Sequence, residues 1–321
     1  MKTLKEYTAM VENAVSDLRL PTDRFPNLYE PVVYGMEEGG KRLRPILLLM
    51  AYEAVGGNPS DATAPAVGIE MFHNFTLLHD DVMDRSELRR GRPTVHKKWN
   101  ENTAILSGDT MVSLATRLIA EVPDNALRKV LDEFNRTALA VYEGQADDMD
   151  FETREDVSLP EYLDMIEGKT SALLAGALKI GALAAGADDK TANALWKYGL
   201  NLGFAFQIQD DWLDVYGDPE TFGKPIGGDI LNRKKTFLLI SAMNNPEVSP
   251  LIDKALDTED PQERINAVRE IYSRFGIPEI CKETVNEYCS AALASLEGAE
   301  ISADAAEAFR SMVNKIIGRQ K

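Results

Sequence analysis

The segment FHNFTLLHDDVMD, residues 72–84, joins an apolar, helix-forming run to the acidic motif DDVMD. Because an α-helix makes one turn in about 3.6 residues, Asp80 and Asp84 would lie on one face of it, one turn apart. A second segment of the same form, FQIQDDWLD at residues 206–214, starts its own acidic motif about 130 residues later, at Asp210. The repetition predicts two matching acidic helices, each continuous with apolar sequence.

Helical periodicity dominates the rest of the chain, and we find no convincing train of alternating strands. The breaker GGNP at residues 56–59 would end one helix, and the next is expected over about residues 61–85. The second acidic helix is expected over about residues 193–216. No linker rich in glycine, proline or serine interrupts the sequence, so we expect one all-α domain over residues 1–321, built as a helical bundle.

Closely spaced carboxylates repel one another unless a cation compensates their charge. A single DDxxD motif could be a solvated helix face. Two such motifs within apolar sequence would be costly to bury without compensation. Hard divalent cations bind oxygen ligands, and magnesium keeps water and substrate phosphates in its shell. The two motifs therefore indicate a diphosphate that is held through magnesium between two acidic helices.

The chain carries a formal net charge of −17, which argues against a nucleic-acid partner because phosphates would be repelled. Three basic clusters stand out against this charge: KRLR at residues 41–44, RRGR at residues 89–92 and RKK at residues 233–235. A compact anion explains such local clusters better than a polymer does. Arg89 and Arg90 follow the first acidic motif closely, which favours phosphate binding there over a surface ion pair.

Other polar residues are open to two interpretations. His73 lies two turns below Asp80 on the same face, so it is either a core histidine or a contact for the ligand. The residues GKTS at 168–171 would weaken a helix, and a carbonyl freed at a kink would favour a cation. A tolerated irregularity is the simpler interpretation of GKTS. We find no nucleophile motif, Walker loop or zinc-binding spacing.

The cellular location of the protein is suggested by two kinds of segment that we do not find in the sequence. No apolar run reaches the roughly 18–20 residues needed to cross a bilayer, and the first residues have no apolar signal-peptide core. Cys281 and Cys289 would lie about 12 Å apart on one helix, too far for a disulfide. We therefore expect a cytoplasmic protein whose cysteines are packing residues.

Seven elements appear in a fixed order: GGKRLRP (39–45), LLHDDVMD (77–84), RRGRPT (89–94), EGQADD (143–148), KTSAL (169–173), FQIQDDWLD (206–214) and GKPIGGDI (223–230). In this set the chain resembles the trans-isoprenyl diphosphate synthases, the polyprenyl synthetase family, of the short-chain geranylgeranyl and farnesyl diphosphate synthase type. The resemblance implies the isoprenoid synthase fold, a helical bundle around a deep central cavity, and a homodimer. It also implies an enzyme, a trans-prenyltransferase that joins an allylic diphosphate to isopentenyl diphosphate, head to tail, and releases pyrophosphate.

The same resemblance implies a role for each site residue. Three magnesium ions, for which manganese could substitute, are expected with bound diphosphate on six carboxylates, the first three of them as the main ligands: Asp80, Asp84, Asp210, Asp81, Asp211 and Asp214. The allylic diphosphate is expected to bind to Arg89, Lys169, Lys224 and Lys234. Isopentenyl diphosphate is expected to bind to Lys41, Arg44, His73 and Arg90. The carbocation and the homoallylic pocket are expected to be lined by Thr170, Gln207 and Phe206, with Gln145 and Asp148 nearby.

Product length depends in this family on bulky residues four or five positions before the first acidic motif, here Thr76 and Phe75, with Phe72 further down the helix. An extended isoprene unit matches about one helical turn of roughly 5.4 Å. One aromatic residue beside a small one implies a geranylgeranyl product, with farnesyl next, unless Phe75 is core packing alone. Helical geometry places Thr76 on the aspartate face and Phe75 off it. A bend of the helix and neighbouring side chains would therefore have to turn the Phe75 ring toward the aspartate face.

Two other functions remain open at this point. A class I terpene cyclase would share the first acidic motif but would not need an isopentenyl diphosphate site. DDWLD and GGKRLRP argue against it. A non-catalytic regulatory subunit of a heteromeric synthase would be expected to lose some of the aspartates, and this chain retains all six.

Overall fold

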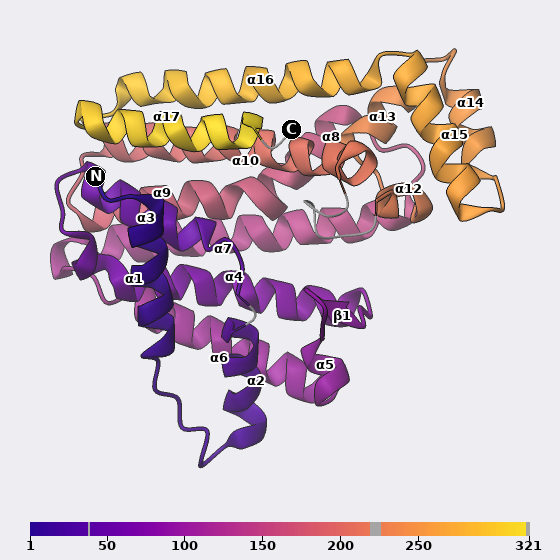
Figure 1. Cartoon of the computed structure of the whole chain (residues 1–321). Coiled ribbons are helices and arrows are strands. Elements are labelled where there is room, and N and C mark those ends of the chain that lie inside the picture. Colours follow the sequence, from indigo (N-terminus) through magenta and orange to yellow (C-terminus); the bar gives the residue numbers. More distant parts are fainter. Residues whose placement is uncertain (38, 219–225, 319–321) are drawn as a thin grey trace. The chain divides into compact units, whose positions relative to one another are not determined.

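The computed structural model describes residues 1–37, 39–218 and 226–318 (Figure 1). Helices dominate these residues, which confirms the predicted all-α class. Within the described ranges, no helix is both long and apolar enough to cross a membrane. In chain order the elements are α1 (Leu4–Ser16), α2 (Pro26–Glu37), α3 (Leu43–Ala54), η1 (Pro59–Ala62), α4 (Thr63–Met83), β1 (Leu88–Arg89), β2 (Arg92–Pro93), α5 (Val95–Lys98), α6 (Glu101–Ile119), α7 (Asp124–Thr153), α8 (Leu159–Ile166), η2 (Glu167–Ser171), α9 (Ala172–Ala184), α10 (Asp189–Tyr216), α12 (Gly228–Leu231), α13 (Phe237–Met243), α14 (Ser249–Leu256), α15 (Pro261–Arg274), α16 (Ile277–Ser295), η3 (Leu296–Gly298) and α17 (Ala303–Gly318).

The chain forms two compact units. The first unit contains Met1–Arg136, Gly176–Leu195 and Glu300–Ala305. The second unit contains Thr137–Ala175, Trp196–Ala299 and Ala306–Lys321. The DDVMD motif belongs to the first unit and the DDWLD motif to the second, so each motif has its own set of neighbours.

In the first unit, α4 packs along α6, and the two helices lie side by side in Figure 1. Gly68 of α4 permits this close approach, because a Cβ atom there would lie 2.9 Å from the carbonyl oxygen of Ala115. Helix α3 is almost entirely apolar, and its residues 47–49, three leucines, have no exposed surface. This packing fixes α4, whose carboxyl end carries the first acidic motif.

The two acidic helices lie close to their predicted ranges. The first was expected over residues 61–85, and α4 spans Thr63–Met83. The second, α10, spans Asp189–Tyr216, so it begins slightly earlier than predicted and ends where expected. Its start is explained by Asp188, whose Oδ1 accepts a hydrogen bond from the backbone N–H of Thr191 at 2.8 Å and so caps the helix.

A short antiparallel hairpin follows α4 and was not predicted. Strands β1 and β2 pair Leu88 with Pro93 and Arg89 with Arg92. The turn between them, Arg90 and Gly91, has φ angles of 51° and 76°. Positive φ at both residues is typical of the type I′ turn that joins two hairpin strands directly. The hairpin therefore brings the RRGR cluster back beside the end of α4.

In the second unit, α10 packs against the C-terminal helices. The hydroxyl of Tyr198 donates a hydrogen bond to the carbonyl of Phe309 in α17 at 2.8 Å. The thiol of Cys281 in α16 lies 3.6 Å from the carbonyl oxygen of Ile208. Cys281 and Cys289 are both free and buried, which confirms that they are packing residues.

Helix α8 continues into α9 through one turn of π-helix, η2, at residues 167–171. This turn contains the GKTS sequence that predicted an irregularity. Gly168 lies so close to α7 that a Cβ atom on it would approach the carbonyl oxygen of Ala140 to 2.6 Å and would also crowd Gly144. The two glycines therefore allow the π-helical turn to pack directly on α7.

Candidate active site

The first acidic motif lies at the carboxyl end of α4. Asp80 is in the last turn, and Asp84 is the C-cap residue, with its backbone N–H donating to the carbonyl of Asp80 at 2.8 Å. The last turn contains no basic residue. Since the carboxyl end of a helix carries partial negative charge, carboxylates there are unfavourable without a nearby cation. The position of the motif therefore favours cation binding.

Arg89 of the hairpin binds to this motif. Its guanidinium is bidentate on Asp81, with Nε 2.8 Å from Oδ2 and NH2 2.8 Å from Oδ1, and NH2 also lies 3.8 Å from Asp80 Oδ2. Burial raises the pKa of Asp81, and the Arg89 charge opposes that effect. Asp81 thus holds Arg89 in place, and its contribution to a metal shell remains a prediction.

The GGKRLRP segment forms a second basic site in the same unit. Arg44 donates through NH1 to Nε2 of His73 at 3.1 Å, and Arg90 donates to the carbonyl oxygen of Gly39. The Nε of Arg44 is buried and meets no acceptor among the described residues. A ligand oxygen would satisfy that donor. Three of the four residues predicted to bind isopentenyl diphosphate are therefore assembled around this segment, and Lys41 is exposed on it.

The contact with Arg44 fixes the charge state of His73. A guanidinium can only donate, so the Nε2 of His73 must accept and the ring must be neutral. Burial, together with the charges of Arg44 and Arg90, lowers the pKa of His73 well below its usual value of 6.5. Burial also lowers the pKa of Arg44 to about 10, so Arg44 stays charged at neutral pH.

A pH dependence of stability follows from this histidine. Below pH 6.5 the unfolded chain takes up a proton at His73 before the folded chain does, so the free energy of unfolding falls as the pH falls. The slope from this residue is at most about 1.4 kcal/mol per pH unit. We expect His73→Gln, which keeps an acceptor but does not titrate, to lose less stability between pH 7 and pH 5.5 than the unmodified protein. Urea unfolding at several pH values measures this, and parallel curves for the two proteins would contradict it.

The second acidic motif lies in the last two turns of α10, which also ends without a basic residue. Asp210 is half-buried, whereas Asp211 and Asp214 are buried. Asp214 accepts a hydrogen bond from the backbone N–H of Asp229 at 3.0 Å through Oδ2. Its backbone carbonyl accepts from Gly227 at 2.7 Å. Asp214 thus anchors residues 227–229 at the start of α12, in addition to its predicted role in metal binding.

Asp211 is held by three protein donors. Its Oδ2 accepts from the hydroxyl of Tyr162 at 2.6 Å and from the backbone N–H of Phe237 at 2.9 Å. Its Oδ1 accepts from Nε2 of Gln207 at 3.0 Å. Burial, the largest effect, raises the pKa of Asp211 to about 6, with a smaller contribution from Asp229. Asp211 therefore orients other side chains.

Gln207 is oriented by this network. Because its amide nitrogen donates to Asp211, its Oε1 points to Thr170, whose hydroxyl donates to it at 2.9 Å. Lys169, on the same π-helical turn, forms an ion pair with Asp148 at 2.5 Å. A small pocket in the second unit brings these residues together with the two lysines of the RKK cluster. It is lined by Asp148, Tyr162, Met165, Ile166, Lys169, Thr170, Gln207, Asp211, Lys234, Lys235 and Thr236.

The residues predicted to set chain length lie one to two turns before the first motif. Phe75 is buried and packs edge-on against His79, with ring centroids 4.7 Å apart, and against Phe72 at 5.5 Å. Phe72 packs in turn on Phe134 at 5.2 Å. The Thr76 hydroxyl donates to the carbonyl of His73 at 2.7 Å. His79 and Phe72 are thus two of the neighbours that hold the Phe75 ring.

A family model described as polyprenyl synthetase matches residues 25–274, well over half of the chain. The chain belongs to the polyprenyl synthetase family. It is therefore an enzyme, a trans-prenyltransferase that makes short-chain prenyl diphosphates, as the resemblance implied. Members of this family act on isoprenoid diphosphates and use a divalent metal ion.

Three known polyprenyl synthetases illustrate the similarity. The geranylgeranyl diphosphate synthase of Methanosarcina mazei is 46% identical over 241 residues, 74% of each chain. A solved geranylgeranyl pyrophosphate synthase is 42% identical with a TM-score of 0.95, over 99% of each chain. A polyprenyl synthase from Caulobacter crescentus, solved with calcium and isoprenyl diphosphate, is 31% identical with a TM-score of 0.84, over 99% of this chain and 96% of its own. These similarities confirm the isoprenoid synthase fold.

The donor set of this polyprenyl synthetase fits magnesium. Both motifs supply only carboxylate oxygens, which hard cations prefer. In the part of the chain that the structure describes, no group of three or more His, Cys, Asp or Glu side chains could hold a metal ion by itself. A metal held by one or two carboxylates would complete its shell with water and substrate oxygens, which is the usual manner of magnesium binding.

Three predicted site residues are not among the residues of the networks above, and two residues of the polar networks were not predicted. Lys224 lies outside the described residues, Lys234 is exposed, and Phe206 is half-buried. Tyr162 and Arg42 were missed as parts of the polar networks. Arg42 could have been noticed as the one basic residue of KRLR to which no ligand was assigned.

Proposed function

We propose that the enzyme condenses an allylic diphosphate with isopentenyl diphosphate and releases pyrophosphate, with geranylgeranyl diphosphate as the main product and farnesyl diphosphate next. One observation carries this proposal. The adjacent residues Arg89 and Arg90 bind to different partners, Arg89 to the carboxylate of Asp81 and Arg90 to the carbonyl of Gly39 in the GGKRLRP segment. Each arginine therefore lies at a different place where it could bind a diphosphate. An enzyme that joins two diphosphate substrates needs two diphosphate-binding sites, whereas a terpene cyclase needs one.

The allylic diphosphate would bind at the acidic motifs. Three magnesium ions would be held mainly by Asp80, Asp84 and Asp210, with support from Asp81, Asp211 and Asp214, and when bound they would neutralise the leaving diphosphate. Arg89, Lys169, Lys224 and Lys234 would contribute further positive charge to that diphosphate. The carboxylates at both helix ends support this arrangement, because each motif lacks a basic residue in its own last turn.

Isopentenyl diphosphate would bind to Lys41, Arg44, His73 and Arg90. Neutral His73 accepts from Arg44 and so orients its guanidinium, while the buried Nε of Arg44 still requires an acceptor. This donor and the nearby charge of Arg90 are suited to phosphate oxygens. Phe206 would shape the pocket for the isopentenyl chain.

The allylic carbon–oxygen bond breaks and leaves a cation, which the double bond of isopentenyl diphosphate attacks. Thr170 and Gln207 would face that cation, because the Oε1 of Gln207 is held toward Thr170 and provides a fixed negative dipole end. The apolar walls must exclude water until the new carbon–carbon bond forms. The proton lost in the last step can pass to the released pyrophosphate, so no separate base is required.

We further propose that the enzyme acts as a homodimer in the cytoplasm. Family resemblance supports the dimer, and the composition of the chain supports the location. Size-exclusion chromatography with light scattering would test the dimer.

The experiment that tests the function uses labelled isopentenyl diphosphate with dimethylallyl, geranyl and farnesyl diphosphate as primers, in the presence of magnesium. Turnover should require isopentenyl diphosphate and should occur with this chain alone. Consumption of a primer without isopentenyl diphosphate would indicate a terpene cyclase. Activity only after a second protein is added would indicate a regulatory subunit.

The orientation of Gln207 gives a separate prediction. Tyr162→Phe removes one donor from Asp211 and should loosen the network that fixes Gln207, so we expect kcat to fall about tenfold, equal to about 1.4 kcal/mol. Both KM values should change little, because no diphosphate contact is lost. Tyr198→Phe is the matched control, since it removes a buried hydroxyl in the same unit from the carbonyl of Phe309. Equal kcat losses in both variants would contradict the prediction.

A further inference from the structure

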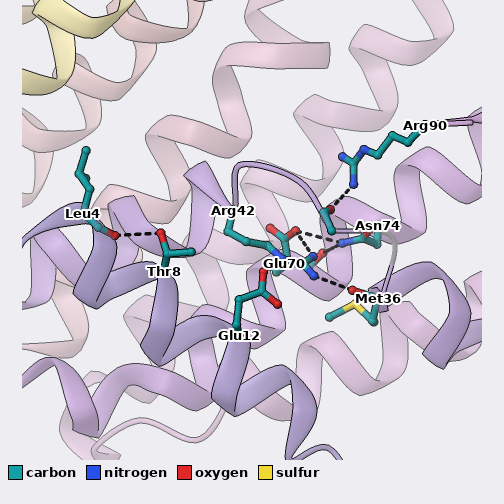
Figure 2. Close-up of polar contacts among 9 residues, drawn as sticks. Leu4, Thr8, Glu12, Met36, Arg42, Glu70, Asn74 and Arg90 are labelled. Atoms are coloured by element: carbon teal, nitrogen blue, oxygen red, sulfur yellow. Dashed lines mark hydrogen bonds and ion pairs between the residues drawn. The ribbon is translucent and has the colours of Figure 1, made fainter. Parts of the chain in front are cut away.

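Arg42 is a buried arginine in the middle of the GGKRLRP segment, and its side chain is 1% exposed. Figure 2 shows its guanidinium between three acceptors from three different helices. Nε donates to Glu12 at 2.8 Å, NH1 donates to Glu70 at 2.8 Å, and NH2 donates to the carbonyl of Met36 at 2.6 Å. All three nitrogens of the guanidinium are therefore engaged within the protein.

The backbone of Arg42 is in a conformation that side chains disfavour. It has φ 46° and ψ 35°, the left-handed region, directly before the first residue of α3. A residue with a Cβ adopts this conformation at an energetic cost, so surrounding contacts must hold it there. The three hydrogen bonds of the Arg42 side chain are the contacts that can do so. Its carbonyl also accepts the first bond of α3, from Ile46 at 3.2 Å.

This left-handed residue separates two predicted ligands of isopentenyl diphosphate. Lys41 precedes it and is exposed, whereas Arg44 follows it within the first turn of α3. If the backbone at Arg42 relaxed to an ordinary conformation, the direction of the chain between these two residues would change. The positions of the two cations relative to each other therefore depend on Arg42.

The network also connects this segment with the helix that carries His73. Glu70 lies one turn before His73 on α4, is buried, and also accepts from the amide of Asn74 at 3.2 Å. Arg42 therefore fixes the segment against the helix on which Arg44 finds its own acceptor, His73. Glu12 adds a connection to α1, a helix that carries none of the predicted site residues.

We propose that Arg42 is a positioning residue for the isopentenyl diphosphate site: it holds the left-handed turn between Lys41 and Arg44 through Glu12, Glu70 and the carbonyl of Met36. The proposal rests on the proposed function for the identity of the ligand. Arg42 itself does not contact the ligand, because its nitrogens are engaged with the protein. Its loss should weaken binding of isopentenyl diphosphate and leave the allylic diphosphate unaffected.

The test compares three variants by steady-state kinetics with both substrates. Arg42→Met combined with Glu70→Gln removes the anchor without leaving a buried carboxylate unpaired. Arg42→Gly removes the anchor but accepts the left-handed backbone without cost. Glu12→Gln weakens only one of the three hydrogen bonds of the Arg42 side chain. We expect the KM for isopentenyl diphosphate to rise about 10- to 100-fold in the first variant and less in the other two, with the allylic KM unchanged.

One further measurement and one control variant make the outcome decisive. Amide hydrogen exchange of residues 40–46 in the substrate-free protein should be faster in the variants, and this readout does not require activity. Arg128→Met is the control, because Arg128 is exposed in the same unit and should alter neither KM nor exchange.

Three results would overturn the proposal. An unchanged isopentenyl KM in the double variant Arg42→Met with Glu70→Gln would show that the side-chain anchor is not needed. An equal rise in both KM values would indicate general damage to the protein. Unchanged exchange at residues 40–46 would show that the turn is held without Arg42. Failure of the proposed function gives a different result, since the unmodified protein would then show no turnover that depends on isopentenyl diphosphate.

Discussion

Replacing Asp80 by asparagine is expected to lower kcat/KM by about 10³-fold, equal to about 4 kcal/mol. Asparagine keeps the size of the side chain and removes its charge. It therefore weakens the proposed magnesium site at the carboxyl end of α4, where the helix adds its own partial negative charge. The concentration of magnesium needed for half-maximal activity should rise in the same variant. Steady-state kinetics over a range of magnesium concentrations measures both effects.

Glu87→Gln is the matched control for Asp80→Asn. Glu87 is an exposed carboxylate just beyond the first motif, and its Oε1 lies 3.6 Å from Nζ of Lys97. Its replacement should change kcat/KM less than twofold, as is usual for an exposed ion pair. If Asp80→Asn lost less than tenfold and kept the magnesium dependence of the unmodified enzyme, Asp80 would not be a metal ligand.

Phe75→Ala is expected to lengthen the product by at least one isoprene unit. The ring of Phe75 is buried between His79 and Phe72, so its removal opens a space that those neighbours fill only partly. One isoprene unit needs about one helical turn, roughly 5.4 Å. The reciprocal change, Thr76→Phe, places a ring on the aspartate face and should shorten the product. Liquid chromatography of the dephosphorylated products distinguishes the chain lengths.

The control for Phe75→Ala is Phe25→Ala, which removes a phenyl ring that is 47% exposed in the same unit. Its product distribution should match that of the unmodified enzyme. If Phe75→Ala also left the products unchanged while lowering the thermal stability, the ring would be a core residue and the floor of the cavity would lie elsewhere.

The all-α class and the two acidic helices could be predicted from local sequence rules. Apolar residues at helical spacing located α4 and α10, because such patterns report burial along one face. A local irregularity was predicted from GKTS, since glycine and hydroxyl residues weaken a helix locally, but its form as a π-helical turn was not. The hairpin of β1 and β2 was missed, because strands this short carry no alternating pattern. The strand pairing and the positive φ of Arg90 and Gly91 reveal its turn in the structure.

The polar networks could not be predicted, because they join residues that are distant in the sequence. Tyr162 and Asp211 are 49 residues apart, and Arg42 and Glu70 are 28 apart. No local pattern distinguishes Tyr162 from other tyrosines on amphipathic helices. Asp211 was assigned with the metal ligands from its place in DDWLD, and only the fold reveals that its oxygens accept from Tyr162, Phe237 and Gln207.

The turn at Arg90 and Gly91 has a consequence for how such an enzyme can change. Two consecutive arginines reach two different sites only because the reversal of the chain has a fixed length. Arg89 ends the first strand and Arg90 opens the turn, so insertion or deletion of one residue would replace the two-residue turn that directs their side chains to different partners. The length of this hairpin is therefore as constrained as the identity of its arginines.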